Sequence, residues 1–210
     1  MILLTKPEPY LIRSFLVDQV TASFSYPEVG ATQQALPIGY AVNHTRKQLG
    51  HGQAVFNSAC AALKSWQHLQ LGWVDCWPHN ARMKVDEQIA IVGRAFGLWW
   101  LNACRVVYVI DDGHHGARFG YAHGTLPDHL ASGEERFLVE MTADEGVWVD
   151  VLAFSRPQTA VARVGYPLMR LAQRQFGVQS AARVRAAVDH VMRGSPARQT
   201  NTSIHLANSS

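Results

Sequence analysis

The spacing of apolar and polar side chains divides the chain into a helical start, a strand-rich middle and a helical end. Residues 8–23 carry apolar side chains at three- and four-residue spacings, which predicts a short amphipathic helix. Residues 40–49 alternate between two faces and end at Gly50 and Gly52, which predicts a strand. Residues 53–66 predict a helix, since one stripe holds their apolar side chains: Val55, Phe56, Ala59, Cys60, Leu63 and Trp66.

Six further strand-like runs follow residue 71. Turn signals such as Asp144-Glu-Gly146 separate them, and the connections are too short for parallel crossovers, which need about a dozen residues. Together with the strand at 40–49 they predict a seven-stranded antiparallel sheet. The six runs cover residues 72–78, 88–96, 101–111, 117–125, 134–142 and 147–155.

A long helical segment opens at Pro157 and keeps one apolar stripe to about residue 191. Gly165, Pro167 and Gly177 predict kinks or a break in it. The other face carries five arginines, which we interpret as a solvated helix face in preference to a basic surface that binds a partner. They are Arg163, Arg170, Arg174, Arg183 and Arg185.

These segments predict the domain organisation. Residues 1–23 form an N-terminal helical extension, and residues 24–193 form a single domain without repeats or linkers. The composition then shifts to Ser, Thr, Asn and Gln, so residues 194–210 are expected to be a disordered tail.

The order of elements predicts an α+β fold with a seven-stranded antiparallel sheet, a long C-terminal helix and an extra N-terminal helix. This order resembles the helix-grip fold of START lipid-transfer domains, Bet v 1-like plant allergens and polyketide cyclases, and the resemblance implies a curved sheet that wraps the C-terminal helix. The resemblance implies an apolar cavity between sheet and helix, a kind of concave site that binds small molecules. A lipocalin-like barrel is disfavoured, because a closed barrel needs no long amphipathic helix to cover an open sheet face.

Four motifs carry a second resemblance. They are Tyr26-Pro-Glu-Val-Gly-Ala-Thr32, Leu49-Gly-His-Gly52 with the helix after it, Leu98-Trp-Trp-Leu-Asn-Ala-Cys-Arg-Val-Val-Tyr108, and Phe119-Gly-Tyr-Ala-His-Gly-Thr125. Taken together and in this order, they are similar to uncharacterised protein family 0548, also known as DUF1990, over most of residues 24–176. One departure is His123 before Gly124-Thr125, where a tyrosine is expected.

Composition narrows the class of protein. A chain of 210 residues with 48% hydrophobic content forms one globular core, and its net charge of +3 gives no nucleic-acid footprint. Cys60, Cys76 and Cys104 lie far apart among apolar residues, which favours buried, reduced thiols. The N-terminal apolar run is too short for a signal peptide, and no segment is long enough to insert into a membrane. We therefore expect a cytoplasmic protein.

The strand at 117–125 sorts its side chains most clearly. Gly120, Ala122 and Gly124 share one face, which leaves room for a ligand or for a close-packed element such as the last helix. On the other face, Tyr121 and His123 are either hydrogen-bonding groups of a site, where they can act as acid and base, or residues of a solvent-facing surface.

The strand at 101–111 carries a single charge inside it, Arg105. A buried arginine needs a partner, because an unpaired interior charge costs several kcal/mol. Arg105 either binds a ligand anion or pairs with Glu140 or Asp150, and we favour the structural pair. Alternation places Tyr108 on the opposite face, together with Asn102, Cys104, Val106 and Ile110.

Other acidic and basic residues give weaker signals. Glu134 and Glu135 are adjacent, so they point to opposite faces and at most one is directed inward. Asp75 lies between Trp73 and Trp77, and His44 shares a face with Arg46. For Asp75, as for His44 and Arg46, we favour a structural role. No histidine or cysteine spacing predicts a metal site, and no phosphate-binding or nucleophile-elbow motif occurs.

The leading hypothesis is a protein that binds a small apolar molecule between sheet and C-terminal helix, without a cofactor. The alternative is a cofactor-independent lyase, cyclase or hydrolase that uses the same cavity. A third interpretation is a partner-binding module that uses the arginine face. The residues predicted to bind the ligand are Arg105, Tyr108, Tyr121, His123 and Trp148.

Overall fold

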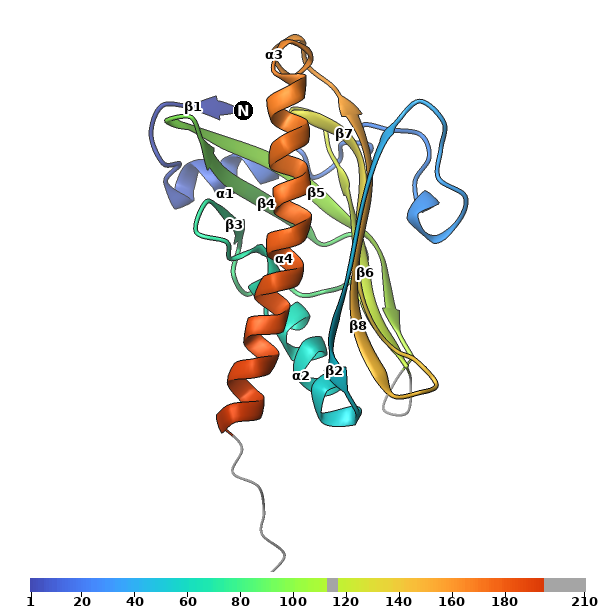
Figure 1. Ribbon diagram of the computed structural model, residues 1–210. Coiled ribbons are helices and arrows are strands. Elements are labelled where there is room, and N and C mark those ends of the chain that lie inside the picture. The colour runs from blue at the N-terminus through green and yellow to red at the C-terminus, as the bar shows by residue number, and fades with distance from the viewer. Residues whose placement is uncertain (113–116, 195–210) are drawn as a thin grey trace, which may run out of the picture.

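The computed structural model describes residues 1–112 and 117–194 (Figure 1). The predicted tail lies outside the described residues apart from Gly194. The helices are α1 (Pro9–Val17), α2 (Gln53–Lys64), α3 (Ala160–Val164) and α4 (Tyr166–Gly194), with short 3-10 turns at Ala31–Gln33 and Gln67–Leu69. The strands are β1 (Ile2–Leu3), β2 (Ala41–His51), β3 (Val74–Trp77), β4 (Gln88–Ala95), β5 (Leu98–Asp111), β6 (Arg118–Thr125), β7 (Ala131–Met141) and β8 (Gly146–Pro157).

Seven strands form a continuous antiparallel sheet in the order β2-β8-β7-β6-β5-β4-β3, and the short β1 pairs with β5 beside this path. The chain therefore meanders from β3 to β8 through short connections. Strand β2, which precedes them in the sequence, lies next to β8 at the edge of the sheet opposite β3. The sheet curls into a half-barrel, and α4 runs along its concave side (Figure 1). This confirms the predicted helix-grip architecture.

The two halves of α4 meet the sheet differently. The C-terminal half buries Ala181, Val184 and Val188, which join the main core cluster with side chains of α2 and of the sheet. Gly177 lies within this one continuous helix, and a β-carbon there would meet Thr45 Oγ1 of β2 at 3.2 Å. Of the three predicted positions, Gly165 marks the break, between α3 and α4, whereas Gly177 permits close approach of helix and sheet.

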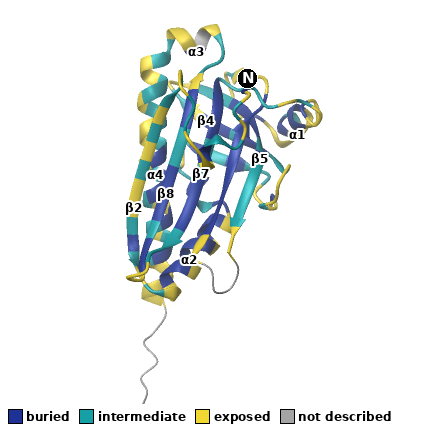
Figure 2. Cartoon of the chain, turned by 90° about the vertical axis from the view of Figure 1, so that its right-hand side faces the viewer, coloured by how far each residue is buried: buried dark blue, intermediate teal, exposed yellow. Residues whose placement is uncertain are grey.

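The two faces of the sheet have separate apolar clusters. The main cluster fills the concave side between the sheet, α2 and α4, and it includes Leu63, Trp66 and Phe137. A smaller cluster lies on the outer side, where Phe15 and Leu16 of α1 pack against β4 and β5. The two clusters bury side chains on both sides of the central strands, and these strands are largely buried in Figure 2.

Strand β5 contains the one irregularity that changes the predicted faces. Its register against β6 shifts between Val106 and Tyr108, so Val107 forms a bulge. An extra residue reverses the alternation that follows it. Tyr108 therefore pairs with Ala122 and points to the outer face with Arg105, whereas Val106 pairs with His123. The prediction that Tyr108 and Val106 share a face is wrong for this reason.

Candidate functional site

A pocket of about 330 Å³ lies between the concave face of the sheet and the N-terminal half of α4. Strands β4 to β8 form its floor and sides, and α3 with the first turns of α4 covers it.

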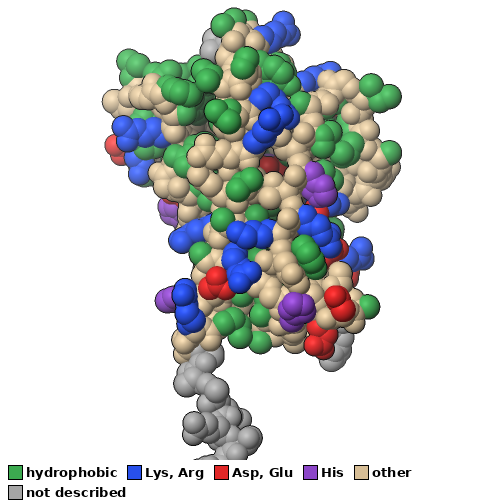
Figure 3. Space-filling model, in the orientation of Figure 1, with side chains coloured by type: hydrophobic (Ala, Val, Ile, Leu, Met, Phe, Trp, Pro, Cys, Tyr) green, Lys and Arg blue, Asp and Glu red, His purple; other side chains and the backbone are tan. Residues whose placement is uncertain are grey.

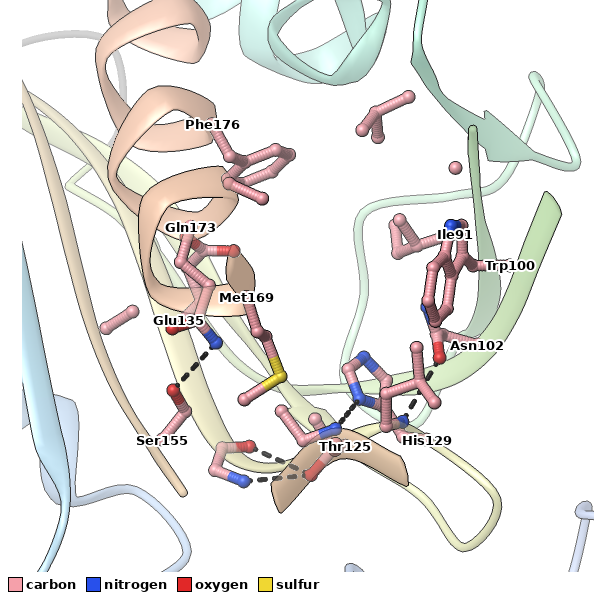
Figure 4. A pocket seen from close by; sticks show the side chains of 18 of the residues that line it. Ile91, Trp100, Asn102, Thr125, His129, Glu135, Ser155, Met169, Gln173 and Phe176 are labelled. Carbon is pink, nitrogen blue, oxygen red and sulfur yellow. Dashed lines mark hydrogen bonds between the residues drawn. The ribbon is translucent and has the colours of Figure 1, made fainter. Parts of the chain in front are cut away.

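Apolar side chains from both layers form the walls of the pocket. Ile91 and Trp100 come from β4 and β5, and Met169 and Phe176 face them from α4 (Figure 4). Phe96, at the β4–β5 hairpin, is 75% exposed and also lines the pocket, so this hairpin borders the opening. A molecule inside would contact hydrophobic surface on most sides.

Polar groups gather at the floor, and several of them already bind protein partners. Gln173 of α4 donates to Ser155 Oγ across 3.0 Å, which ties the helix to β8. Thr125 Oγ1 accepts from the Gly133 N–H at 3.0 Å and lies 2.6 Å from Ser25 Oγ. Asn102 Oδ1 accepts from the Leu130 N–H at 3.2 Å. These groups therefore stabilise the floor.

Glu135 and His123 form the ionisable part of the floor. They are opposite each other on β7 and β6, and His123 Nε2 lies 3.7 Å from Glu135 Oε2, beyond hydrogen-bonding distance. Burial raises the pKa of Glu135 to about 8 and lowers the pKa of His123 to about 4. Around neutral pH this floor therefore favours an uncharged carboxyl beside an uncharged imidazole.

His129, in the loop between β6 and β7, is a further imidazole on the floor. Its Nδ1 accepts a hydrogen bond from the Ala131 N–H at 3.0 Å. Burial lowers its pKa to about 3, with a further contribution from His123. The ring is neutral, and its Nε2 points into the pocket (Figure 4).

Of the five residues predicted to bind a ligand, only His123 lines this pocket. Tyr121 lies on the same face but is fully buried in the core, where its hydroxyl is 2.7 Å from His68 Nε2 and its ring stacks on Phe137. Burial holds the pKa of Tyr121 well above its ordinary value. Neither Tyr121 nor His123 faces solvent, so that alternative is wrong.

Arg105 and Tyr108 lie on the outer face of the sheet, away from the pocket. Arg105 donates to the carbonyl oxygens of Gln19 and Val20 at 3.1 and 2.9 Å, just beyond α1. The partners expected for it, Glu140 and Asp150, bind other arginines, so that expectation is corrected. The Tyr108 hydroxyl is 2.6 Å from Thr32 Oγ1.

Trp148 also points outward, because its neighbours Val147 and Val149 enter the main core. Its ring lies 5.0 Å from the guanidinium of Arg46. The five predicted residues thus do not converge on one site.

An ionic cluster on the outer face is centred on Asp150. Its carboxylate accepts from Arg136 at 2.8 Å and lies 2.7 Å from His44 Nε2, and Arg46 bridges it to Glu140. Hydrogen bonds and charge from His44 and Arg136 lower the pKa of Asp150 despite its burial. These contacts support the structural role expected for His44 and Arg46.

The segment at residues 24–32, and not the last helix, covers the small-residue face of β6 at Gly124. A β-carbon at Gly124 would clash with the Tyr26 hydroxyl and lie 2.8 Å from the Phe24 ring. Tyr26 in turn donates to Glu134 at 2.7 Å, and the same carboxylate accepts from the N–H groups of Gly30 and Thr32. Glu134 thus anchors this segment on the outer face, opposite Glu135, as alternation predicted.

The arginine face of α4 is partly bound to the protein itself. Arg170 donates to the Val42 carbonyl at 3.2 Å, and Arg185 donates to the Gln48 carbonyl at 3.1 Å and to Asp189 at 2.9 Å. Figure 3 shows basic side chains spread along this side of the molecule. These contacts favour a structural role for at least these two arginines.

Asp75 is half exposed and lies 3.6 Å from His79 Nδ1, outside the pocket. Within residues 1–112 and 117–194, no group of histidine, cysteine and acidic side chains is arranged to hold a metal ion. The three cysteines are free and buried. No helix in the described part of the chain is long and apolar enough to cross a membrane.

The sequence did not predict that His129 lines a site, and it did not show whether Glu134 or Glu135 points inward. His129 sits in a loop without periodicity, so no pattern pointed to the floor. Glu135 required knowing which face of β7 is concave. The one available signal was pairing, since Glu135 faces His123 once β6 and β7 are aligned as a hairpin.

Known sequences match most of the length of this chain. The family model described as domain of unknown function (DUF1990) matches residues 25–183. A UPF0548 protein of Dictyostelium discoideum is 33% identical over 202 residues, covering 87% of this chain and 94% of its own. A UPF0548 protein of Deinococcus radiodurans is 36% identical, covering 89% and 99%.

Among solved structures, the Zhui aromatase/cyclase of Streptomyces sp. R1128 superposes with a TM-score of 0.50 at 7% identity, covering 73% of this chain and 98% of that one. At this identity the likeness shows the fold alone. The sequence matches show more: this chain belongs to the DUF1990 family, the UPF0548 proteins.

Proposed function

We propose that the protein binds a small, largely apolar molecule in the pocket between the sheet and α4, without a metal or nucleotide cofactor. The observation that supports the proposal is the pocket itself, about 330 Å³ with aromatic and aliphatic walls and with most of its polar groups at the floor. Ligand sites in proteins are typically apolar cavities of about 300–1,000 Å³ with a few polar groups that orient the ligand.

Small residues in both layers keep this space open. Gly93 and Ala153 face it from the sheet, and Ala162 and Ala172 face it from the helices. Protein interiors are otherwise close-packed, with few voids larger than a water molecule. A larger residue at any of these positions would fill the space, so the open volume supports a site that receives a molecule.

Native mass spectrometry of protein purified from its own host tests the proposal. We expect a bound small molecule in the wild-type protein that is released on denaturation. Ala172→Trp introduces an indole into the pocket from α4 and should abolish that adduct.

The matched control is Leu171→Trp, one residue away on α4, where the side chain is 63% exposed and points away from the pocket. It should retain the bound molecule. A wild-type protein without any adduct that also fails to bind apolar probes would refute the proposal, as would equal binding by the two tryptophan variants.

A cofactor-independent enzyme is the second candidate function, and one observation favours it. Glu135 presents a carboxyl to the pocket with a pKa of about 8, close to the pH at which a general acid or base works best. His123 lies beside it as a neutral imidazole. Tyr121 is buried in the core and does not line the pocket. Arg105 and Tyr108 lie on the other side of the sheet, so they cannot contact a substrate in the pocket.

This second candidate predicts that Glu135→Gln keeps ligand affinity within severalfold and lowers turnover by about 10²- to 10⁴-fold. The assay is conversion of the copurified molecule, followed by mass spectrometry. Full activity in Glu135→Gln would exclude Glu135 as the catalytic residue.

A further inference from the structure

The hydrogen bonds of the pocket floor determine which polar group a ligand can bring there. The Ala131 backbone N–H donates to His129 Nδ1 at 3.0 Å, so this nitrogen must present its lone pair. The proton of the neutral ring is then on Nε2, which points into the pocket (Figure 4). Backbone geometry thus fixes His129 as a donor toward the ligand.

The Nε2–H of His129 has no acceptor within the described residues. Other polar groups of the floor, Thr125, Ser155 and Gln173, already bind one another or the backbone. The Oδ1 of Asn102 is also occupied, by the Leu130 N–H. His129 is partly buried, and a second N–H donor of the pocket lining, Trp100 Nε1, is buried and has no partner among the described residues. A donor that loses water without gaining an acceptor is unfavourable, so the pocket favours a molecule that supplies an acceptor.

The charges around the floor exclude an anion. Arg94 is the one lysine or arginine among the pocket-lining residues described, and it is exposed at the hairpin with its guanidinium 5.5 Å from the Trp99 ring. Glu135 lines the floor, and 20% of its side chain is exposed. A ligand carboxylate at the floor would be desolvated without a cation beside it.

We infer that the ligand carries an uncharged hydrogen-bond acceptor, such as a ketone, ester or amide carbonyl, which accepts the Nε2–H of His129 while its apolar body lies against Trp100, Met169 and Phe176. This inference rests on the proposed function and adds the polar chemistry of the ligand.

Three probes that share one ring system test the inference by calorimetry: naphthyl methyl ketone, ethylnaphthalene and naphthoate. We expect the ketone to bind the wild-type protein about three- to tenfold more tightly than ethylnaphthalene, the gain of one hydrogen bond. Naphthoate should bind most weakly. His129→Asn keeps an acceptor for the Ala131 N–H and removes Nε2, so it should abolish the preference for the ketone and leave ethylnaphthalene binding unchanged.

The outcomes distinguish the inference about the polar group of the ligand from the proposal that the pocket binds a ligand at all. Equal binding of ketone and hydrocarbon, or a His129→Asn variant that keeps the preference, overturns the inference while the pocket remains a binding site. Tightest binding of naphthoate also overturns it. Failure of all three probes, with no adduct on the purified protein, refutes the ligand-binding proposal itself.

Discussion

Replacing Glu135 by glutamine should change how the stability of the protein depends on pH. The carboxyl of Glu135 has a pKa of about 8 in the folded protein, against an ordinary value of 4.5, because burial disfavours the charged form. Between these values the unfolded chain is ionised while the folded protein keeps the proton. Ionisation of Glu135 therefore does not reduce the free energy of unfolding below pH 4.5. It reduces that free energy progressively as the pH rises from 4.5 toward 8.

The magnitude follows from the width of the window. One pKa unit corresponds to about 1.4 kcal/mol, so a rise from pH 6.5 to 8 should lower the free energy of unfolding by about 2 kcal/mol through Glu135. Glutamine keeps the size of the side chain and cannot ionise. The difference in stability between Glu135→Gln and wild type should grow by this amount in favour of the variant. The buried histidines are common to both proteins, so their contribution largely cancels.

Urea unfolding followed by tryptophan fluorescence at both pH values measures this difference, with equal m-values as the check on two-state behaviour. Glu145→Gln is the control, because it removes a carboxyl from the exposed turn between β7 and β8. It should follow the wild-type pH dependence. An identical pH dependence for Glu135→Gln and wild type would refute the placement of a neutral, buried carboxyl at the pocket floor.

Three further predictions concern the rest of the molecule. Tyr26→Phe removes the hydrogen bond to Glu134 and should lower the free energy of unfolding by about 1.5–3 kcal/mol in urea; a loss near zero would contradict the anchoring role of Glu134. Gly124→Ala places a methyl group against Phe24 and Tyr26 and should cost about 1–3 kcal/mol, whereas a stability equal to wild type would show that the segment at 24–32 yields easily. A thiol reagent should label the free cysteines slowly in the folded protein and rapidly in urea, because they are buried and burial raises the pKa of Cys60 to about 12; fast labelling of the native protein would contradict their burial.

The elements of this fold could be predicted because each depends on local periodicity. Strand alternation and turn residues located the seven strands to within about three residues at each boundary, and the helical stripe located α2 and α4. The two-residue strand β1 is too short to carry a pattern.

The site was less predictable because it depends on which face of each strand is concave. The bulge at Val107 moves Tyr108 to the outer face, and no residue type in the sequence predicts this bulge. Arg105 donates hydrogen bonds to backbone carbonyls of a segment more than eighty residues earlier, and periodicity does not predict such a contact. His129 reaches the floor from a loop. Glu134 and Glu135 were correctly assigned to opposite faces, but only the three-dimensional pairing assigns Glu135 to the pocket.

A crystal structure of the protein purified from its own host tests most directly whether a small molecule binds in the pocket between the sheet and α4. We expect electron density for a compact, mainly apolar molecule between Trp100 and Phe176, with an uncharged acceptor within hydrogen-bonding distance of His129 Nε2. A pocket that holds only water, or one that the side chains of Phe176 and Met169 fill, would contradict the proposed binding of a small molecule.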